Sequence, residues 1–540
     1  MIDDAEKNRS KSNVRATASR VLSNSDVGVG IGSDYVRGGH DRISASSSTV
    51  AYFSEKEIRV IGYAATVTST HGPAANADVE PCARTLTNFV ASSIEAPGST
   101  EGGPVAQPPA ETFPEGGLEA WLVVLGAWLA LFSSLGILNS LATFQTYVST
   151  HQLMEQSQST IGWIFSLNAF MCFFAGVYIG PVFDKYGPRW LVLAGTMCLV
   201  GSLVLLSFCT VILANNVVPS PELWHFILVF GLMNGLALAL LFTPSIAAIG
   251  HFFSARRGFA TGIASTGGGL GGVCIPLMLQ SLFDRVGWAW GIRTLALVSL
   301  ILSGLSNILL RSRLAPALDA STHPDVRIFR NVPFALTTLG VFLLEFALFV
   351  PLTYISTYTL SRGFSASFAS QVVTILNAGS VVGRVLPGWY ADKIGPFNAN
   401  IIAVILAIVS CLVIWLPTSM LDSTLVSSSG GDDRNSAAAA PVVLFALLFG
   451  FTSGSNISLI PVSIGRLCAT TNYGRYYATC YTAVSVATLV GIPIAGKILI
   501  IDGGEYWGLI VFTAALYVGS LVALFAAKAS NIGWSLLGKF

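Results

Sequence analysis

The sequence predicts an all-α polytopic membrane protein with twelve transmembrane helices in two six-helix halves. The prediction rests on the composition of the 540-residue chain, on its recurring apolar segments and on an internal repeat. Hydrophobic residues make up 53% of the chain and charged residues 11%, against about 25% charged residues in a typical soluble domain. Because so few charges cannot cover a soluble surface, we expect most of the chain to lie in lipid.

The charged residues are distributed unevenly along the chain. Residues 1–115 contain 10 basic and 14 acidic side chains, which leaves 19 and 14 for the remaining 425 residues. The first segment is rich in Ser, Ala, Gly and Thr, and it shows no basic region followed by a sustained apolar core. We therefore expect no secretory signal peptide, and we predict a disordered cytoplasmic tail at residues 1–117.

Apolar runs of about 20 residues recur after this tail, and about 20 residues are needed to cross the hydrocarbon core of a membrane. They predict an N-terminal half at 118–310, a cytoplasmic linker at 311–332 and a C-terminal half at 333–530. The predicted spans are 119–148, 160–182, 190–212, 223–249, 258–282, 289–310, 333–360, 368–391, 398–420, 441–463, 475–499 and 506–528.

The basic residues between and after the spans predict the orientation. Cytoplasmic segments of membrane proteins carry an excess of Lys and Arg. With the N-terminus inside, thirteen basic residues after residue 115 fall on the cytoplasmic side and four on the other side. We therefore expect a multi-pass protein of the plasma membrane with both termini in the cytoplasm.

Two short motifs recur in the same order. Segments 180–188 and 388–396 share Gly, Asp, Lys, Gly and Pro at the same spacing, 208 residues apart. The run that begins Arg257-Gly-Phe-Ala-Thr resembles the one that begins Arg475-Tyr-Tyr-Ala-Thr, 218 residues later. These two repeated segments indicate that the second half duplicates the first. Many secondary transporters have this plan, with the substrate site between the halves near the membrane midplane.

The first motif resembles the G-x-x-x-D-x-x-G-x-R signature of the major facilitator superfamily. The first copy is complete, and the second lacks only the final Arg, where Phe397 stands. The motif residues are Gly180, Asp184, Gly187 and Arg189 in the first copy and Gly388, Asp392 and Gly395 in the second.

The electrostatics of helix ends suggest a role for the two Asp residues of this motif. Each lies at the C-terminus of its own helix, where the helix dipole disfavours an anion. The fifth and eleventh helices begin on the same side, and their positive N-termini can accept a carboxylate. The resemblance implies that Asp184 docks on the eleventh helix and Asp392 on the fifth, which closes the cytoplasmic gate. The alternative is a pair of solvated loop charges.

Two further stretches resemble the monocarboxylate porter (MCT) family. Segment 115–121 resembles the acidic-Gly-Gly-aromatic sequence at the start of that family's first helix. Segment 251–262, which contains Arg256 and Arg257, resembles its aromatic-Phe-x-x-Arg-Arg-x-x-Ala-x-Gly signature. Segment 138–147 resembles the corresponding sequence in the fungal branch of this family. This branch implies substrates as varied as carboxylates, riboflavin-like heterocycles and secondary metabolites for export.

The chain departs from the animal lactate–proton members of that family at two positions. Those members carry a Lys in the first helix where this chain has Asn139. They also carry an Asp one turn before an Arg of the eighth helix; here the Arg is Arg384 and the Asp position is Ser380. Proton-coupled lactate transport by the animal scheme is therefore not expected.

Two charged residues deep inside predicted spans are candidates for function. Arg384 is eight residues before Asp392, or about 12 Å along the helix at 1.5 Å per residue. In one interpretation, its side chain pairs with a substrate carboxylate in a water-filled cavity. In the other, its side chain extends to the cytoplasmic surface or donates hydrogen bonds to backbone carbonyl groups. Glu345 lies in the middle of the seventh span, where it either carries a proton or is a neutral, hydrogen-bonded acid. The two helices belong to one half, so we expect that the two side chains can lie close together.

Several other classes of protein are excluded by the sequence. Cysteines form no CxxC pair, and neither His225 nor His251 has a second ligand-type residue three or four positions further on, so we predict no metal. Two nucleotide-like motifs, at 267–272 and 491–497, lie in predicted spans rather than in strand–loop–helix units. With a net charge of +1, the chain offers nothing that favours nucleic acid. We predict no enzyme activity, no nucleotide and no cofactor, and we leave proton coupling open.

The leading hypothesis is a secondary transporter in the lipid bilayer that carries a small organic molecule, an organic anion in particular, by alternating access. Two alternatives stay open: an efflux pump for a fungal secondary metabolite of a biosynthetic cluster, and a transporter-like receptor that senses without transporting. The predicted substrate or coupling residues are Asn139, Glu345, Ser380 and Arg384, and Arg256 and Arg257 join the motif residues at the gate.

Overall fold

The computed structural model describes residues 113–209, 223–314, 322–420, 432–533 and 538. Residues 1–112 of the predicted tail and residues 315–321 of the predicted linker lie outside this part of the chain. Everything that follows concerns the described residues after Ala110, which form one compact unit.

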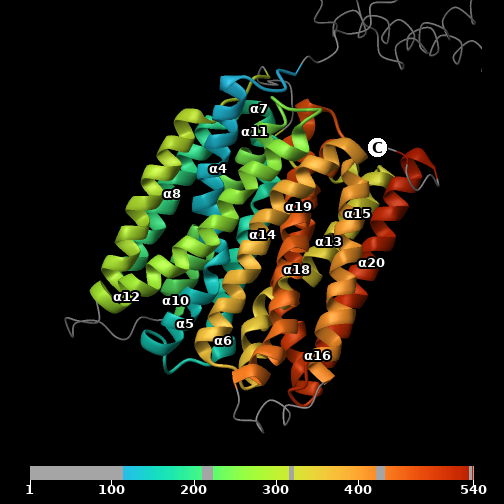
Figure 1. The fold of residues 1–540 in the computed structure, drawn as a ribbon. Coiled ribbons are helices and arrows are strands. Elements are labelled where there is room, and N and C mark those ends of the chain that lie inside the picture. The colour runs from blue at the N-terminus through green and yellow to red at the C-terminus, as the bar shows by residue number, and fades with distance from the viewer. Residues whose placement is uncertain (1–112, 210–222, 315–321, 421–431, 534–537, 539–540) are drawn as a thin grey trace, which may run out of the picture. The chain divides into compact units, whose positions relative to one another are not determined.

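The helices of the first predicted half lie side by side in a bundle (Figure 1). Two of them are interrupted: a π-helical segment, η1, precedes α11, and the second span consists of α6 and α7 in succession. The elements are α4 (Leu118–Asn139), α5 (Leu141–His151), α6 (Gln158–Phe174), α7 (Gly176–Tyr186), α8 (Arg189–Phe208), α10 (Leu223–Phe226), η1 (Ile227–Asn234), α11 (Gly235–Ile249) and α12 (Arg257–Leu309).

The second predicted half continues the same bundle. A short 3-10 helix, η2, precedes its first long helix, and another, η4, precedes α19. The elements are η2 (Val326–Arg330), α13 (Val332–Ser361), α14 (Ala366–Ile394), α15 (Pro396–Val409), the π-helical η3 (Ser410–Trp415), α16 (Leu416–Met420), α18 (Asp432–Gly465), η4 (Thr470–Asn472), α19 (Tyr473–Ile501) and α20 (Trp507–Ile532).

Eleven helical stretches of the described chain are long and apolar enough to span a membrane. The longest, α12, has 53 residues and contains Gly287, whose φ of 75° and ψ of 177° are not helical. Two spans therefore meet at Gly287, as the sequence predicts for the fifth and sixth helices. The predicted all-α membrane fold is confirmed.

The prediction of one continuous span at 119–148 is wrong. Helix α4 ends at Asn139, because Ser140 has a non-helical backbone conformation with φ −96° and ψ 1°. The Ser140 hydroxyl donates a hydrogen bond to the carbonyl oxygen of Gly136 at 2.6 Å. The remaining residues form the separate helix α5. The local hydrogen bond offers the backbone an alternative to the helix, which apolar patterning does not reveal.

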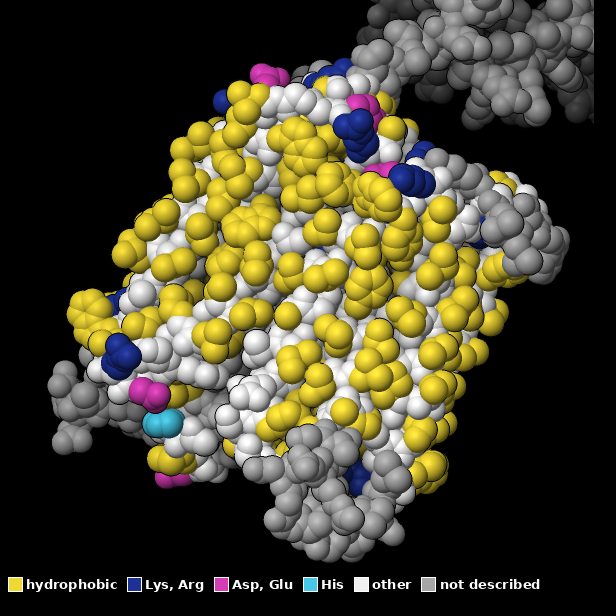
Figure 2. Space-filling view, viewed as in Figure 1, with side chains coloured by type: hydrophobic (Ala, Val, Ile, Leu, Met, Phe, Trp, Pro, Cys, Tyr) yellow, Lys and Arg dark blue, Asp and Glu magenta, His cyan; other side chains and the backbone are white. Residues whose placement is uncertain are grey.

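Large apolar side chains cover the middle of the outer surface, whereas most charged side chains in this view lie near the two ends of the bundle (Figure 2). Met197 on α8, for example, is 65% exposed, and Leu297 on α12 is 58% exposed. Such an apolar surface suits contact with hydrocarbon.

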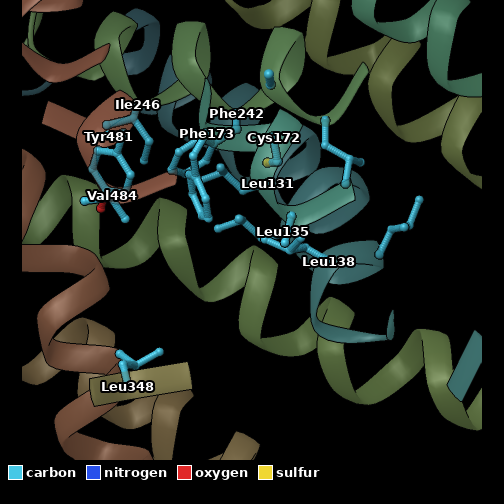
Figure 3. Packing of buried hydrophobic residues seen from close by; sticks show 14 of the residues in the cluster. Leu131, Leu135, Leu138, Cys172, Phe173, Phe242, Ile246, Leu348, Tyr481 and Val484 are labelled. Carbon is cyan, nitrogen blue, oxygen red and sulfur yellow. The ribbon is translucent and has the colours of Figure 1, made fainter. Parts of the chain in front are cut away.

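Helix α19 of the second half packs against the first half. The Tyr481 ring lies 5.4 Å from the ring of Phe173 on α6 and 5.8 Å from that of Phe242 on α11, between ring centroids. Figure 3 shows Tyr481 and Val484 on the side that faces Phe173 and Phe242, with Leu348 of α13 farther away. The apolar core thus runs across the contact between the halves.

The ends of the bundle are not equivalent in sequence. Helices α7 and α14 end, and α12 and α19 begin, at one end, which carries both copies of the repeated motif. We call this the motif end, and we call the other the opposite end, where α5 and α16 lie (Figure 1).

Candidate functional site

Asp184 joins the two halves at the motif end. It lies in the last turn of α7 and is 9% exposed. Its carboxylate accepts hydrogen bonds from the backbone N–H groups of Gly474 and Arg475, both at 2.8 Å. These groups belong to the first turn of α19, so the carboxylate occupies the positive end of the helix dipole.

Asp392 makes the corresponding contact in the other direction. It lies in the last turn of α14, and its carboxylate accepts hydrogen bonds from the N–H groups of Gly258 at 2.7 Å and Phe259 at 3.0 Å. Both donors lie in the first turn of α12. The two docking contacts expected from the repeat are therefore present, and their role as a gate stays a prediction.

The motif glycines explain how the helices come so close. A Cβ on Gly180 would collide with the carbonyl oxygen of Gly474, and one on Gly388 with that of Gly258. Gly187 and Gly395 follow the ends of α7 and α14 with φ values of 77° and 94°, in the left-handed region that favours glycine. Two glycines of the motif thus permit contact, and two end the helices.

Arg257 also bridges the halves. It starts α12, is 8% exposed, and places its guanidinium carbon 3.8 Å from the ring centroid of Tyr473, the first residue of α19. The Tyr473 hydroxyl in turn donates to the carbonyl oxygen of Pro461 on α18 at 2.9 Å. A guanidinium over a ring face is an attractive contact, and here it adds to the two carboxylate contacts.

The other two basic residues predicted for the gate lie differently. Arg256 is exposed, and it contributes its backbone N–H to Glu115. Arg189 is exposed as well, and its carbonyl oxygen accepts a hydrogen bond from the Asn307 amide at 3.0 Å. Arg257 is therefore the basic residue of the predicted set whose side chain lies between the halves.

Glu115 is a functional candidate to which sequence reasoning assigned no role. Its carboxylate accepts hydrogen bonds from the backbone N–H groups of Ser254 at 2.8 Å, Ala255 at 2.7 Å and Arg256 at 3.0 Å. Within the described chain it is the one non-glycine residue with a positive φ, 51°. The signal available in the sequence was an acidic residue just before two glycines at the start of the first helix.

Glu115 and Asp392 therefore accept hydrogen bonds from neighbouring backbone N–H groups. Glu115 binds the three residues just before α12 and within its cap, and Asp392 binds the first turn of α12. One carboxylate comes from the chain before α4 and the other from the second half. Glu115 thus holds in place the helix start on which Asp392 docks.

Arg384 and Asn139 meet the same stretch of α12 in the interior. Arg384 on α14 is 2% exposed, and its Nη1 donates to the carbonyl oxygen of Ser265 across the halves, whereas its Nε has no partner. The Asn139 amide on α4 donates to the carbonyl oxygen of Gly268 at 3.0 Å. Ser380, one turn before Arg384 on α14, is 3% exposed.

Glu345 lies apart from these residues. It is 3% exposed on α13, and its electrostatic neighbours are Cys480 and Tyr481 on α19 and Tyr517 on α20. Arg384 is not among the interacting groups of Glu345 in the described part of the chain. Within the described residues, no hydrogen bond or ion pair joins the two side chains in this state.

The described residues contain no group of three or more His, Cys, Asp or Glu side chains that could hold a metal ion. His251, in the loop before α12, is 4% exposed, and its Nδ1 lies 2.9 Å from the Ser312 hydroxyl. Burial, together with the charge of Arg257, lowers the pKa of His251 to about 4, so that its imidazole is neutral at neutral pH.

The family model described as Major Facilitator Superfamily matches residues 120–430. The chain belongs to the major facilitator superfamily. It is therefore a multi-pass secondary transporter of a small molecule and not an enzyme. This family membership agrees with the repeated motif and with the two-way docking of Asp184 and Asp392.

Fungal transporters are similar to this chain over most of its length. An MFS-type transporter of Gibberella moniliformis is 36% identical over 409 residues, which cover 76% of this chain and 90% of the relative. Riboflavin transporter MCH5 of Saccharomyces cerevisiae is 33% identical, with 78% and 81% covered. Aspyridones efflux protein apdF of Emericella nidulans is 32% identical, with 79% and 81% covered.

Solved structures support the fold. A bacterial homologue of the iron transporter ferroportin, in an outward-facing state, matches with a TM-score of 0.57 at 12% identity, covering 77% of this chain and 100% of that chain. The human organic anion transporter MFSD10 (TETRAN) matches with a TM-score of 0.55 at 17% identity, covering 76% and 100%. At these identities the likeness concerns the fold alone.

The Asp184 contact can be tested with Asp184→Asn, which keeps the shape of the side chain and removes its charge. Without that charge, we expect the halves to separate more often at the motif end. A cysteine in place of Ala478, which packs against Gly180, reports this separation. Its alkylation should become about fivefold faster, the change that a loss of about 1 kcal/mol in the closed state produces.

Asp284→Asn is the matched control, because Asp284 is exposed near the Gly287 turn, far along α12 from the motif end. Equal alkylation of the Ala478→Cys reporter in both variants would contradict a closing role for Asp184.

The Glu115 contact predicts a loss of stability in Glu115→Gln. Glutamine has one acceptor oxygen and no charge, so it cannot satisfy all three N–H groups. We expect the free energy of unfolding to fall by about 1–2 kcal/mol, as when a helix cap is lost. Thermal unfolding of the purified protein measures this change. Glu119→Gln, an exposed acid in the first turn of α4, should change little; a matching loss in both variants would refute the capping role.

Proposed function

We propose that this chain is a monocarboxylate porter-like transporter of the fungal branch that moves a small organic anion across the plasma membrane by alternating access. In this proposal both termini are cytoplasmic, so the motif end faces the cytoplasm. The halves at 118–310 and 333–530 rock about the substrate site, joined by the linker at 311–332. The excess of basic residues at the motif end supports this orientation.

The observation that carries the substrate class is the buried guanidinium of Arg384. A charged group in the membrane interior is costly unless it faces water, an anion or polar backbone. Here one nitrogen binds the Ser265 carbonyl group of the opposite half, and Nε is left without a partner. A substrate carboxylate offers two acceptors to a guanidinium and suits this unsatisfied group better than a carbonyl oxygen does.

The contacts at the motif end support alternating access. Two carboxylates and one guanidinium join helix starts of one half to the other half at that end. Such contacts close the bundle toward the cytoplasm in this state, and each is weak enough to break during a cycle. Substrate would enter from the opposite end and leave at the motif end, or the reverse.

Glu345 is our candidate for proton coupling. Its neighbours Cys480 and Tyr481 lie on α19, the same helix whose first turn receives Asp184. Gain or loss of a proton at Glu345 changes the charge next to α19 and so biases the position of this helix relative to the first half. Coupling would then run through α19 rather than through direct pairing with Arg384.

Export of a secondary metabolite is the second candidate function. It is favoured by relatives such as the aspyridones efflux protein, which is 32% identical over 79% of this chain. Export and uptake use the same site and gate, so the two functions differ in the substrate and in the direction of the gradient. Deletion of the gene separates them: a loss of export would lead to accumulation of the metabolite inside the cell.

Charge recognition is tested with Arg384→Gln and Arg384→Lys. We expect Arg384→Gln to reduce transport of an anionic substrate by more than about tenfold, because it removes the buried charge. Arg384→Lys should retain an intermediate rate, because lysine keeps the charge without the planar fork. Uptake into proteoliposomes, over a panel of labelled monocarboxylates and their neutral amides, measures the effect.

Arg293→Gln is the control, since Arg293 contacts the Ser207 hydroxyl and aromatic rings within the first half. If Arg384→Gln transported every anion of the panel as well as Arg293→Gln does, the proposed substrate role of Arg384 would be wrong.

If Glu345 carries the coupled proton, Glu345→Gln should lose one transport activity and keep another. Glutamine mimics the protonated acid and cannot release a proton, so accumulation driven by a pH step should be lost. Exchange of labelled for unlabelled substrate should persist, since exchange needs no net proton movement. Both are measured in the same proteoliposomes, with exposed Glu505→Gln as the control. Continued uphill accumulation in Glu345→Gln would assign Glu345 to packing.

A further inference from the structure

A cavity of about 330 Å³ lies at the motif end beside the gate. The end of α7, the start of α8, the loop before α12 and the segment after α12 supply most of its wall. The residues on which its chemistry depends are Arg189, Trp190, His251, Arg311 and Ser312. Neither the interior substrate residues nor Glu345 belongs to it.

The arginines of this cavity have no ionic partner in the part of the chain that the structure describes. Neither the Arg189 nor the Arg311 side chain has a hydrogen bond or ion pair with another residue of the described chain. Helix α8 begins at Arg189 after Pro188, with no side chain capping its N-terminus, so free N–H groups and the positive end of a 20-residue helix add to the field. His251 is neutral, as its pKa of about 4 implies, and it adds no charge.

One carboxylate also lines the cavity, that of Asp184. Its two oxygens are already bound by the N–H groups of Gly474 and Arg475. The negative charge of Asp184 is thus engaged at the start of α19, and within the described residues the two guanidinium groups have no counter-ion. An anion with several acceptor oxygens, such as a phosphate ester, would satisfy them.

The surface next to the cavity is suited to a lipid. Trp190, at the edge of the cavity, is 74% exposed, and Met197, two turns further along α8, is 65% exposed. Ile301 and Ile308 on α12, which packs against α8, are 53% and 65% exposed. An acyl chain can lie along these apolar side chains while its headgroup reaches the arginines, and an exposed Trp is typical of the headgroup level.

We propose that this cavity binds the phosphate group of an anionic lipid in the leaflet at the motif end. Thr471, in η4 before α19, also lines the cavity, so a headgroup bound there touches both halves. Because the cavity includes residues of both halves, the bound lipid stabilises the state in which they meet at the motif end. Basic pockets between membrane helices are known to hold such headgroups.

The test uses the purified full-length chain in detergent and measures its unfolding temperature against added dioctanoyl phosphatidylserine. We expect a saturable increase with this lipid and little increase with dioctanoyl phosphatidylcholine or inorganic phosphate at equal concentration. In Arg311→Gln and in Arg189→Gln, half-saturation should require about tenfold more phosphatidylserine, as expected for the loss of one charge-assisted contact.

Arg327→Gln and Arg330→Gln are the matched controls, because these exposed arginines lie in η2 at the same end but do not line the cavity. They should leave half-saturation unchanged. Equal weakening in all four variants would show attraction to the basic surface as a whole and would overturn the proposal. Equal stabilisation by inorganic phosphate would overturn the lipid as the source of the anion, and the absence of any stabilisation would overturn the site itself.

Discussion

Two carboxylates that lie against the first turns of helices from the other half join the two halves at the motif end. A helix start has N–H groups without intrahelical partners, and Asp184 and Asp392 supply their acceptors from across the interface. Glycines at 180 and 388 allow the backbones to approach closely enough for these bonds. Each contact contributes on the order of 1–2 kcal/mol, which is sufficient to bias a state and small enough to be reversed.

The pseudo-symmetry of the two contacts is broken around them. The start of α12 is held on one side by Glu115, which precedes α4, and receives Asp392 on the other. The start of α19 receives Asp184 and carries the ring of Tyr473 against Arg257. The start of α12 therefore receives one carboxylate from its own half and one from the other, whereas the carboxylate at the start of α19 comes from the opposite half. In addition, α19 lies beside Glu345, so in the coupling that we propose α19 would transmit a change of charge to the motif end.

The sequence predicted the contacts that depend on local chemistry and missed those that depend on how helices are rotated. The spans followed from apolar length, and the docking of Asp184 was implied by the resemblance of a repeated motif, with which the unfavourable position of an acid at a helix C-terminus agrees. The break at Ser140 involves one local hydrogen bond and the cap by Glu115 three, all at span ends. The absence of a hydrogen bond or ion pair between the described residues Glu345 and Arg384 depends on which face of α13 and α14 is turned inward. Helices that are apolar all round carry little periodicity from which to read that face.

The substrate role that we propose for Arg384 would link substrate recognition to the interface between the halves. Its guanidinium, from α14 of the second half, binds the Ser265 carbonyl group on α12 of the first half. An anionic substrate that binds this guanidinium would replace the hydrogen bond to Ser265, which joins the halves, by a bond to the substrate. A ligand shifts a conformational equilibrium only by its differential affinity for the two states. In the mechanism that we propose, substrate binding at Arg384 would remove one interior contact of the present state, and the Asp184 and Asp392 contacts do not involve this guanidinium. The empty and loaded transporters would therefore differ in how strongly their halves are held together, which is the energetic requirement for alternating access.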